Sequence, residues 1–213
     1  MTAGQVWYPN HSGVELATAA LRKGGVIGFP IDTVYGLAAL ASASGSPAAI
    51  SAIKGRSATQ PLILMCSSIE EVRTFAELPP RAKELAERFW PGPLTLILPS
   101  LAGSQSLGGG ATVGVRIPAH PLALQLLASS GPLATASANR HGLDPVSGAV
   151  EALAELPGLA GALTDWEGPK GVPEPSSILD LSQEVPVLVR SGRLGAAELG
   201  LAVSEASPEG RRD

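Results

Sequence analysis

Apolar residues follow two alternating patterns along this chain, short continuous runs and stretches with helical spacing. Apolar runs of about four to eight residues between turn-forming residues are typical of buried strands. Such runs predict strands at 26–30, 61–66, 94–99, 112–118, 133–138, 176–181 and 185–190. Helical spacing of apolar residues predicts helices that begin at Ser12, at Ser46, after Pro80, at Pro121 and near Ser147.

Capping residues mark several of the predicted helix boundaries. Ser12 and Glu15 have the spacing of a capping box, and Gly24 can end the helix that they begin. Ser46, followed by a proline, can begin the next helix, which Gly55 can end. Strands alternate with helices, and two strands follow each other near the C-terminus. The sequence therefore predicts a mixed α/β sheet.

The composition indicates a folded domain. The 213 residues are 45% hydrophobic and 16% charged, with a net charge of −4, which argues against a disordered chain and against a protein that coats nucleic acid. No apolar run reaches the roughly 18 residues of a membrane span, and the N-terminus lacks the order of a signal peptide, so a cytoplasmic protein is expected. One catalytic domain is expected over 1–203, with a polar tail over 204–213.

The common catalytic and metal-binding motifs are absent from the sequence. It has no GxxxxGK[ST], no GxGxxG after a strand and no HExxH. The single cysteine, Cys66, excludes a CxxC motif and is interpreted as a packed thiol, because it follows an apolar strand. His11, His120 and His141 lie in predicted turns without metal-ligand spacing, so no protein-bound metal is expected.

Polar clusters at the predicted strand ends are the remaining candidates for chemistry, because ligand sites of α/β sheets form there. One cluster begins at Asp32 and Thr33. If Gly55 ends a helix, Lys54 and Arg56 can both turn towards one anion; alternatively, Lys54 only favours the helix C-terminus.

Two further clusters involve strands. Arg116 lies four residues after Thr112 on one predicted strand, and an arginine among Val and Ile residues needs an anion, either a ligand or a structural ion-pair partner. Thr135, Ser137 and Asn139 alternate onto one face of a strand end, where they bind a ligand or build a turn. With Ser176 and Arg190, these clusters supply cations and hydroxyls but no obvious base, which suits a polyanion such as ATP.

Seven segments of the sequence resemble, in order and spacing, the threonylcarbamoyl-AMP synthases, the YrdC-like family: PIDTVYGL, KGRSATQPLILM, FWPGPLTLIL, TVGVRIP, SANRHG, PSSILD and VLVRSG. The resemblance covers about residues 12 to 195. It implies an open, twisted, mixed parallel/antiparallel sheet with helices around a concave cationic cleft. The chain is similar to the short, single-domain members, because longer members add a C-terminal domain.

The resemblance also implies a reaction. L-threonine, bicarbonate or CO2, and ATP are joined into threonylcarbamoyl-AMP, and pyrophosphate is released. Mg²⁺ is expected to be carried by the ATP phosphates. The implied partners are the proteins that transfer the threonylcarbamoyl group to tRNA; direct contact with double-stranded RNA or tRNA is left open.

Site residues are assigned by matching each motif. Lys54 and Arg56 are expected to be catalytic. The residues expected to bind L-threonine are Thr33, Met65, Arg116, Thr135 and Ser176. The residues expected to bind ATP are Lys54, Arg56, Gln60, Thr112, Ser137, Asn139, Pro145 and Arg190. The glycine-rich stretch 103–110 is a candidate lid, or alternatively a plain loop.

The sequence departs from the family pattern at four single positions and in one segment, where PSSILD replaces the commoner PSTVVD. Ser57 replaces a usual Pro, Gln60 a usual Asn, Met65 a frequent His, and Asp144 a typical Pro. None of these changes removes a cation. Two rival interpretations stay open: a non-enzymatic relative that binds RNA or nucleotide in the same cleft, and an enzyme that forms carbamoyl-adenylate for another acceptor.

Overall fold

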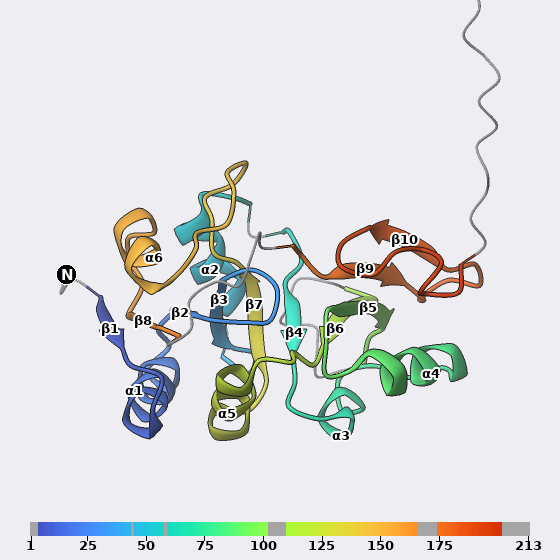
Figure 1. The fold of residues 1–213 in the computed structure, drawn as a ribbon, viewed down its shortest axis with the longest axis horizontal. Helices are drawn as coiled ribbons and strands as arrows, with labels where there is room; N and C mark the ends of the chain where they lie inside the picture. The colour runs from blue at the N-terminus through green and yellow to red at the C-terminus, as the bar shows by residue number, and fades with distance from the viewer. Residues whose placement is uncertain (1–3, 44, 58, 102–109, 166–173, 202–213) are drawn as a thin grey trace, which may run out of the picture.

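A computed structural model describes residues 4–43, 45–57, 59–101, 110–165 and 174–201. The described residues form a ten-stranded mixed sheet in the order β1-β8-β2-β3-β7-β4-β6-β5-β9-β10 (Figure 1). The strands are β1 (Gln5–Trp7), β2 (Ile27–Phe29), β3 (Gly36–Leu40), β4 (Ile63–Met65), β5 (Leu94–Pro99), β6 (Thr112–Arg116), β7 (Leu133–Ser137), β8 (Gly161–Leu163), β9 (Ser177–Asp180) and β10 (Val187–Arg190). The helices are α1 (His11–Arg22), α2 (Ser46–Lys54), α3 (Ile69–Val72), α4 (Pro80–Phe89), α5 (Pro121–Ser130) and α6 (Ala149–Glu155).

The mixed α/β sheet predicted from the sequence is confirmed. Each predicted strand and helix has a counterpart, most of them shorter than predicted. The sequence analysis missed β1, β3, α3 and β8. The strands β3 and β8 read GLAAL and GAL, and glycine and alanine are depleted in strands, so these segments lack the β-branched residues that mark a strand.

The start of α1 differs from the prediction. Its N-cap is Asn10, whose side chain accepts a hydrogen bond from the Gly13 amide, and Ser12 lies inside the helix. Asparagine is as good an N-cap as serine, so the capping box expected at Ser12 does not form. The predicted end of α2 is confirmed, because Gly55 follows Lys54 in the left-handed conformation, with φ of 65°.

Two apolar cores lie on opposite faces of the sheet. One core packs α1 and α5 against Ile27, Phe29 and Leu133. The other lies under α2, α3, α4 and α6 and contains alternate residues of β5 and β6, such as Leu96 and Val115. Figure 1 shows α1 and α5 together on one side of the sheet, with α2 and α6 on the other.

The helices α1 and α5 cover only part of their face. Across β4, β5 and β6, four residues of this face are half-buried, namely Ile63, Ile97, Thr112 and Gly114, whereas Met65, Thr95 and Arg116 on the same face are buried. The loop 30–35 between β2 and β3 passes over β3 and β7 and ends beside β4 (Figure 1). Arg116 of β6 donates to Thr33 and Asp32 of this loop at 2.9 and 2.7 Å, and the Tyr35 hydroxyl donates to the Leu163 carbonyl of β8 at 2.6 Å. The part of the sheet face that the helices leave uncovered is therefore a candidate binding surface.

Two segments named in the sequence analysis are not covered by the described residues. The boundary between 1–203 and the tail 204–213 lies outside the described residues, and so does most of the candidate lid 103–110. Among the described residues, no helix has both the length and the apolar character required to span a membrane.

The Cys66 thiol provides a simple test of this packing. It is fully buried, and burial, followed by the charge of Glu71, raises the pKa of the thiol to about 12. Since only the thiolate reacts rapidly with alkylating reagents, we expect native protein to resist iodoacetamide at mildly alkaline pH and urea-unfolded protein to react. Intact-mass spectrometry measures both states, and rapid labelling of the native protein would contradict the packed environment.

Candidate functional site

Three neighbouring strands bring five of the thirteen predicted site residues onto the partly covered face: Met65, Thr112, Arg116, Thr135 and Ser137. β4 lies between β6 and β7, with Met65 opposite Arg116 and Ile63 opposite both Gly114 and Thr135. Because residues two apart on a strand share a face, Thr112 and Ser137 both lie at one end of this surface, and Arg116 and Met65 lie at the other. On these strands, Thr112 and Ser137, which were assigned to ATP, are therefore separated from Arg116 and Met65, which were assigned to threonine.

Arg116 is buried and held by three hydrogen bonds. Its Nε donates to the Gly92 carbonyl at 2.9 Å, Nη1 donates to Thr33 Oγ1 at 2.9 Å, and Nη2 donates to Asp32 Oδ1 at 2.7 Å. Only 2% of the arginine side chain and 13% of the aspartate side chain are exposed. Burial lowers the pKa of the guanidinium, and the Asp32 carboxylate opposes that shift. The anion that the sequence required is thus present within the chain.

Two further arginines, Arg190 and Arg193, lie close to this ion pair. Arg193 donates to the main-chain carbonyl of Asp32 at 2.9 Å, and the positive charges of Arg190 and Arg193 both act on Arg116. Arg190 donates from Nε to the Ser176 carbonyl at 2.9 Å and from Nη2 to Ser176 Oγ at 3.1 Å. Of the three arginines, only Arg116 pairs with the Asp32 carboxylate. The cluster of Asp32, Arg116, Arg190 and Arg193 therefore has an excess of positive charge, which favours a further anion.

Lys54 lies at the other end of the surface, with its ammonium group inside the protein. Ser137 Oγ lies 3.5 Å from its Nζ. The Nζ donates to three nearer acceptors, the carbonyl of Asn139 at 2.9 Å, Asn139 Oδ1 at 2.8 Å, and the carbonyl of Ser137. An ammonium has three N–H donors, so these three acceptors match its capacity. The residue is 3% exposed, and burial, followed by the positive charge of Arg56, lowers the pKa of the ammonium to about 8.

Arg56 has the opposite environment. Its Nε and Nη2 atoms are shielded from solvent and have no hydrogen-bond partner among the residues that the structure describes. Burial lowers the pKa of this guanidinium. Buried donors without acceptors cost free energy, and an anionic ligand that accepts from both atoms removes that cost. The sequence predicted that Lys54 and Arg56 bind the same anion. In the structure, Arg56 is the one of the two that has unpaired donors for it.

Three further predicted residues, Thr135, Gln60 and Pro145, lie outside the two groups of positive charge described above. Thr135 is buried, and its hydroxyl donates to the Ile63 carbonyl at 2.9 Å. Gln60 and Pro145 are half-buried residues of loops. Within the described ranges, no three His, Cys, Asp or Glu side chains gather in a way that could hold a metal ion.

Three residues of the site were missed by the sequence analysis. Asp32 was noted only as part of its cluster, although a carboxylate next to Thr33 was the signal for a partner of the buried arginine. Arg193 follows the VLVRSG motif by one residue. Thr95, whose hydroxyl lies 2.9 Å from Ser176 Oγ, sits inside an apolar run and carried no signal.

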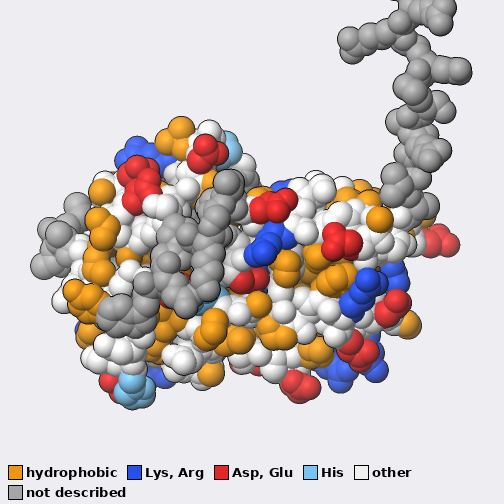
Figure 2. All heavy atoms as spheres, in the orientation of Figure 1, with side chains coloured by type: hydrophobic (Ala, Val, Ile, Leu, Met, Phe, Trp, Pro, Cys, Tyr) orange, Lys and Arg blue, Asp and Glu red, His pale blue; other side chains and the backbone are white. Residues whose placement is uncertain are grey.

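Charge on the molecular surface is mixed on the face drawn in Figure 2. Lys and Arg side chains are interspersed with Asp and Glu over the half that carries α4 and β9. The positive charges described above thus form local groups at the two ends of the site, and the wider cationic cleft implied by the resemblance stays a prediction.

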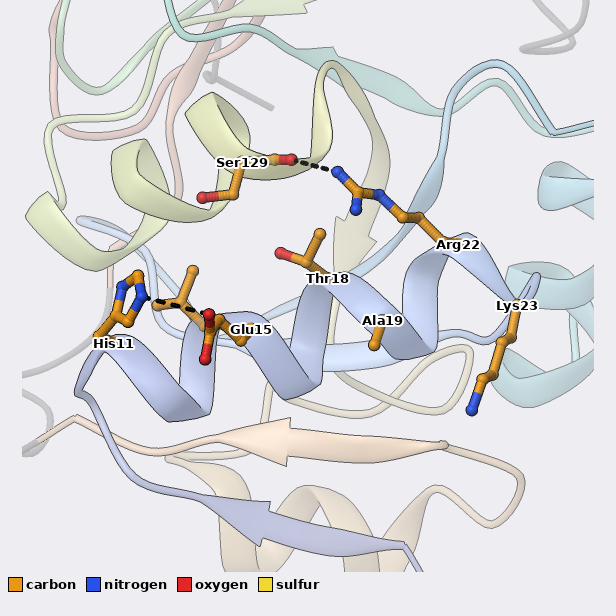
Figure 3. A pocket seen from close by; sticks show the side chains of 8 residues that line it. His11, Glu15, Thr18, Ala19, Arg22, Lys23 and Ser129 are labelled. Atoms are coloured by element: carbon orange, nitrogen blue, oxygen red, sulfur yellow. Dashed lines mark hydrogen bonds and ion pairs between the residues drawn. The ribbon is translucent and has the colours of Figure 1, made fainter.

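A separate cavity of about 600 Å³ lies along α1, away from the predicted site residues (Figure 3). It is lined by His11, Glu15 and Arg22 among others, and His11 Nε2 lies 3.2 Å from Glu15 Oε1. Arg22 Nη2 donates to the Ser129 carbonyl at 3.0 Å, which links α1 to α5. These groups are exposed at the helix surface and pair with each other, so the strand face is the better candidate for chemistry.

Comparison with known proteins shows the family to which the chain belongs. The family model Sua5/YciO/YrdC, described as telomere recombination, matches residues 19–192. The chain belongs to the Sua5/YciO/YrdC family. Proteins named threonylcarbamoyl-AMP synthase from Pyrococcus abyssi and Bacillus subtilis are 37% and 38% identical to it over 90% and 86% of its length. The chain spans only 57% and 54% of the length of these two relatives.

Solved structures of the family share the fold. The crystal structure of P. abyssi Sua5 complexed with L-threonine aligns with a TM-score of 0.85 at 35% identity, over 93% of this chain and 60% of that one. Escherichia coli YciO aligns with a TM-score of 0.80 at 25% identity, over 92% of this chain and 99% of that one. The open mixed sheet expected from the resemblance is thereby confirmed.

The buried ion pair predicts a specific loss of stability. Asp32→Ala leaves the Arg116 charge buried without its carboxylate, so the free energy of unfolding should fall by about 3 kcal/mol in urea titrations followed by circular dichroism. The double variant with Arg116→Met should recover part of this loss, because it removes both charges. Glu87→Ala is the control: it breaks an exposed contact of 3.7 Å with Lys83 and should cost under about 1 kcal/mol. Equal losses for Asp32→Ala and the control would contradict the structural role.

Proposed function

We propose that this protein is a threonylcarbamoyl-AMP synthase, which converts L-threonine, bicarbonate and ATP into threonylcarbamoyl-AMP and pyrophosphate. The observation that carries the proposal is the division of one sheet face into two anion-binding ends. Arg56, whose positive charge acts on Lys54, offers two unpaired buried donors, and Arg116 lies in a cluster of arginines near Thr33. Membership of the family and the L-threonine complex of P. abyssi Sua5 support the same assignment.

The triphosphate is proposed to bind at the end of Arg56. Guanidinium groups bind phosphates through two parallel N–H donors, and Nε and Nη2 of Arg56 form such a pair. The hydroxyls of Thr112 and Ser137 lie at the same end of the strands and can donate to the nucleotide. Gln60, Asn139, Pro145 and Arg190 remain proposed contacts of ATP. The nucleotide is taken as its Mg²⁺ complex, with the metal carried by phosphate oxygens.

L-threonine is proposed to bind near Arg116. Asp32 occupies one edge of the guanidinium, and the neighbouring Arg190 and Arg193 leave the cluster with an excess of positive charge. A substrate carboxylate fits that excess. Thr33, Thr135 and Ser176 supply hydroxyls around it, and Met65 supplies an apolar surface beside Arg116.

The chemistry requires alignment more than a strong base. The threonine amine adds to CO2, forming a C–N bond and releasing a proton, to give a carbamate. A carbamate oxygen then attacks the α-phosphorus, and the bond to the β-phosphate breaks as pyrophosphate leaves. Orientation of the two reactants and stabilisation of the departing charge by Arg56 are the contributions that this site can make. Enzymes that transfer the threonylcarbamoyl group to tRNA must consume this labile product.

Two alternatives use the same cleft. A nucleotide-binding or RNA-binding relative would bind ATP without turnover, and a carbamoyl-adenylate former would release pyrophosphate without threonine. The buried Arg116 and the hydroxyls of Thr33 and Thr135 around it favour the synthase, because none of these residues is among the proposed contacts of ATP.

Substrate dependence separates these alternatives. We expect steady-state pyrophosphate release only when ATP, L-threonine and bicarbonate are all present, since the attacking carbamate forms from the last two. A coupled pyrophosphate assay with each component omitted in turn measures this dependence. Equal release with glycine, with serine or without an amino acid would exclude the proposed substrate.

Arg56 is the residue whose loss should lower turnover most directly. Removing one preorganised charge-stabilising donor typically lowers the rate about 10²- to 10³-fold, and we expect this loss for Arg56→Gln with little change in melting temperature. Arg56→Lys should recover little activity, because an ammonium lacks the planar pair of donors. The control is Arg88→Gln on the exposed surface of α4, which should keep full turnover. Near-normal turnover of Arg56→Gln would reject the assignment.

A further inference from the structure

Lys54 and Arg56 are two residues apart, yet their positive groups have different surroundings. The Lys54 ammonium has four oxygen acceptors within the segment 137–139, the farthest being Ser137 Oγ at 3.5 Å, whereas Arg56 has unpaired donors among the described residues. Gly55 between them takes the left-handed conformation, which ends α2 and redirects the chain. A lysine whose three donors are already used has none left for a phosphate.

The segment that receives Lys54 is the turn after β7. Asn139 accepts from Lys54 and from the Ser137 hydroxyl through Oδ1, and donates through Nδ2 to the carbonyls of Arg140 and Leu143 at 2.9 and 2.8 Å. The main chain of Lys54 also joins this turn, because its carbonyl accepts from the His141 amide at 2.8 Å. The end of α2 and the turn after β7 are thus one hydrogen-bonded unit.

We infer that Lys54 is a positioning residue, which acts by holding the turn of Ser137 and Asn139 in place rather than by touching the phosphates of the nucleotide. This inference rests on the proposed function, in which Ser137 contacts ATP. The ammonium is a tetrahedral donor surrounded by two main-chain carbonyls and one amide oxygen. That arrangement fixes the direction of the Ser137 hydroxyl, since its acceptor, Asn139 Oδ1, is also an acceptor of Lys54.

The choice between lysine and arginine at this position provides the sharpest test. A cation that binds phosphate directly can be replaced by arginine, whereas a planar guanidinium does not match acceptors arranged around one tetrahedral nitrogen. We expect Lys54→Met and Lys54→Arg each to lower kcat/KM for pyrophosphate release by about 10²-fold, because small displacements of positioning groups have effects of that size. Restoration to within about twofold of wild type by Lys54→Arg would overturn the inference.

Inorganic tripolyphosphate separates the two roles without the reaction. It carries the phosphates of ATP but not the nucleoside, and its affinity is measured by calorimetry. We expect Arg56→Gln to weaken this ligand about tenfold or more, and Lys54→Met to leave its affinity within about twofold of wild type. A loss for Lys54→Met as large as that for Arg56→Gln would show direct contact and reject the positioning role.

Coupling between variants identifies the partner through which Lys54 acts. In a double-mutant cycle on kcat/KM, Lys54→Met and Asn139→Ala should be strongly non-additive, whereas Lys54→Met and Arg56→Gln should be close to additive. The reverse pattern would contradict the inference. Lys83→Met, an exposed lysine of α4, is the matched control and should change none of these measurements.

Hydrogen exchange of main-chain amides tests the order of the turn after β7 even when no pyrophosphate release can be measured. The Val146 amide donates to the Ala138 carbonyl, and the Ala138 amide donates to Tyr35, so both report on the turn. Both should exchange faster in Lys54→Met than in wild type and remain unchanged in Arg56→Gln; unchanged exchange in Lys54→Met would overturn the inference.

If wild type releases no pyrophosphate with threonine, the proposed function fails, while the tripolyphosphate and exchange measurements still test Lys54. If Lys54→Met does not fold, Lys54→Arg is measured by the same two methods.

Discussion

The buried guanidinium of Arg116 is the interaction on which the rest of this site depends. A charge with 2% of its side chain exposed is stable only if its donors are paired, and the partners come from Gly92, Thr33 and Asp32. Two of these three partners lie in the loop 30–35, so satisfying one arginine draws that loop across the sheet. The loop in turn carries Thr33 to the face where substrates are proposed to bind.

The open part of the sheet face follows from how the helices are distributed. α1 and α5 cover the strands near β2 and β3, while Thr112, Gly114 and Ile63 remain half-buried across β6 and β4. Gly114 leaves room, since a Cβ built there meets its nearest neighbours, Thr95 and Ile63, only at 3.7 and 3.8 Å. Such a surface suits a reaction that has to hold two anionic reactants side by side and align them.

Two cations only two positions apart serve different purposes because one glycine separates them. The left-handed Gly55 ends α2 with the Lys54 side chain directed into the turn after β7, and Arg56 leaves in another direction. The ammonium then stabilises protein structure, and the guanidinium keeps donors for a ligand. This division of roles connects the Lys-Gly-Arg segment to the Ser-Ala-Asn segment, which lies more than eighty residues later in the sequence.

The sequence by itself determined the mixed α/β class, most helices and strands, and the family, and it supplied the candidate polar residues of the site. These properties depend on local patterns: apolar runs, Pro and Gly at helix ends, and ordered motifs. It did not reveal β3 and β8, whose Gly and Ala residues become strands only through pairing with neighbouring strands. Only the tertiary structure decided which anion pairs with Arg116 and which of Lys54 and Arg56 remains free. The physical reason is that a hydrogen bond depends on the positions of both partners, and here the partners are separated by 84 residues for Arg116 and Asp32, and by 85 for Lys54 and Asn139.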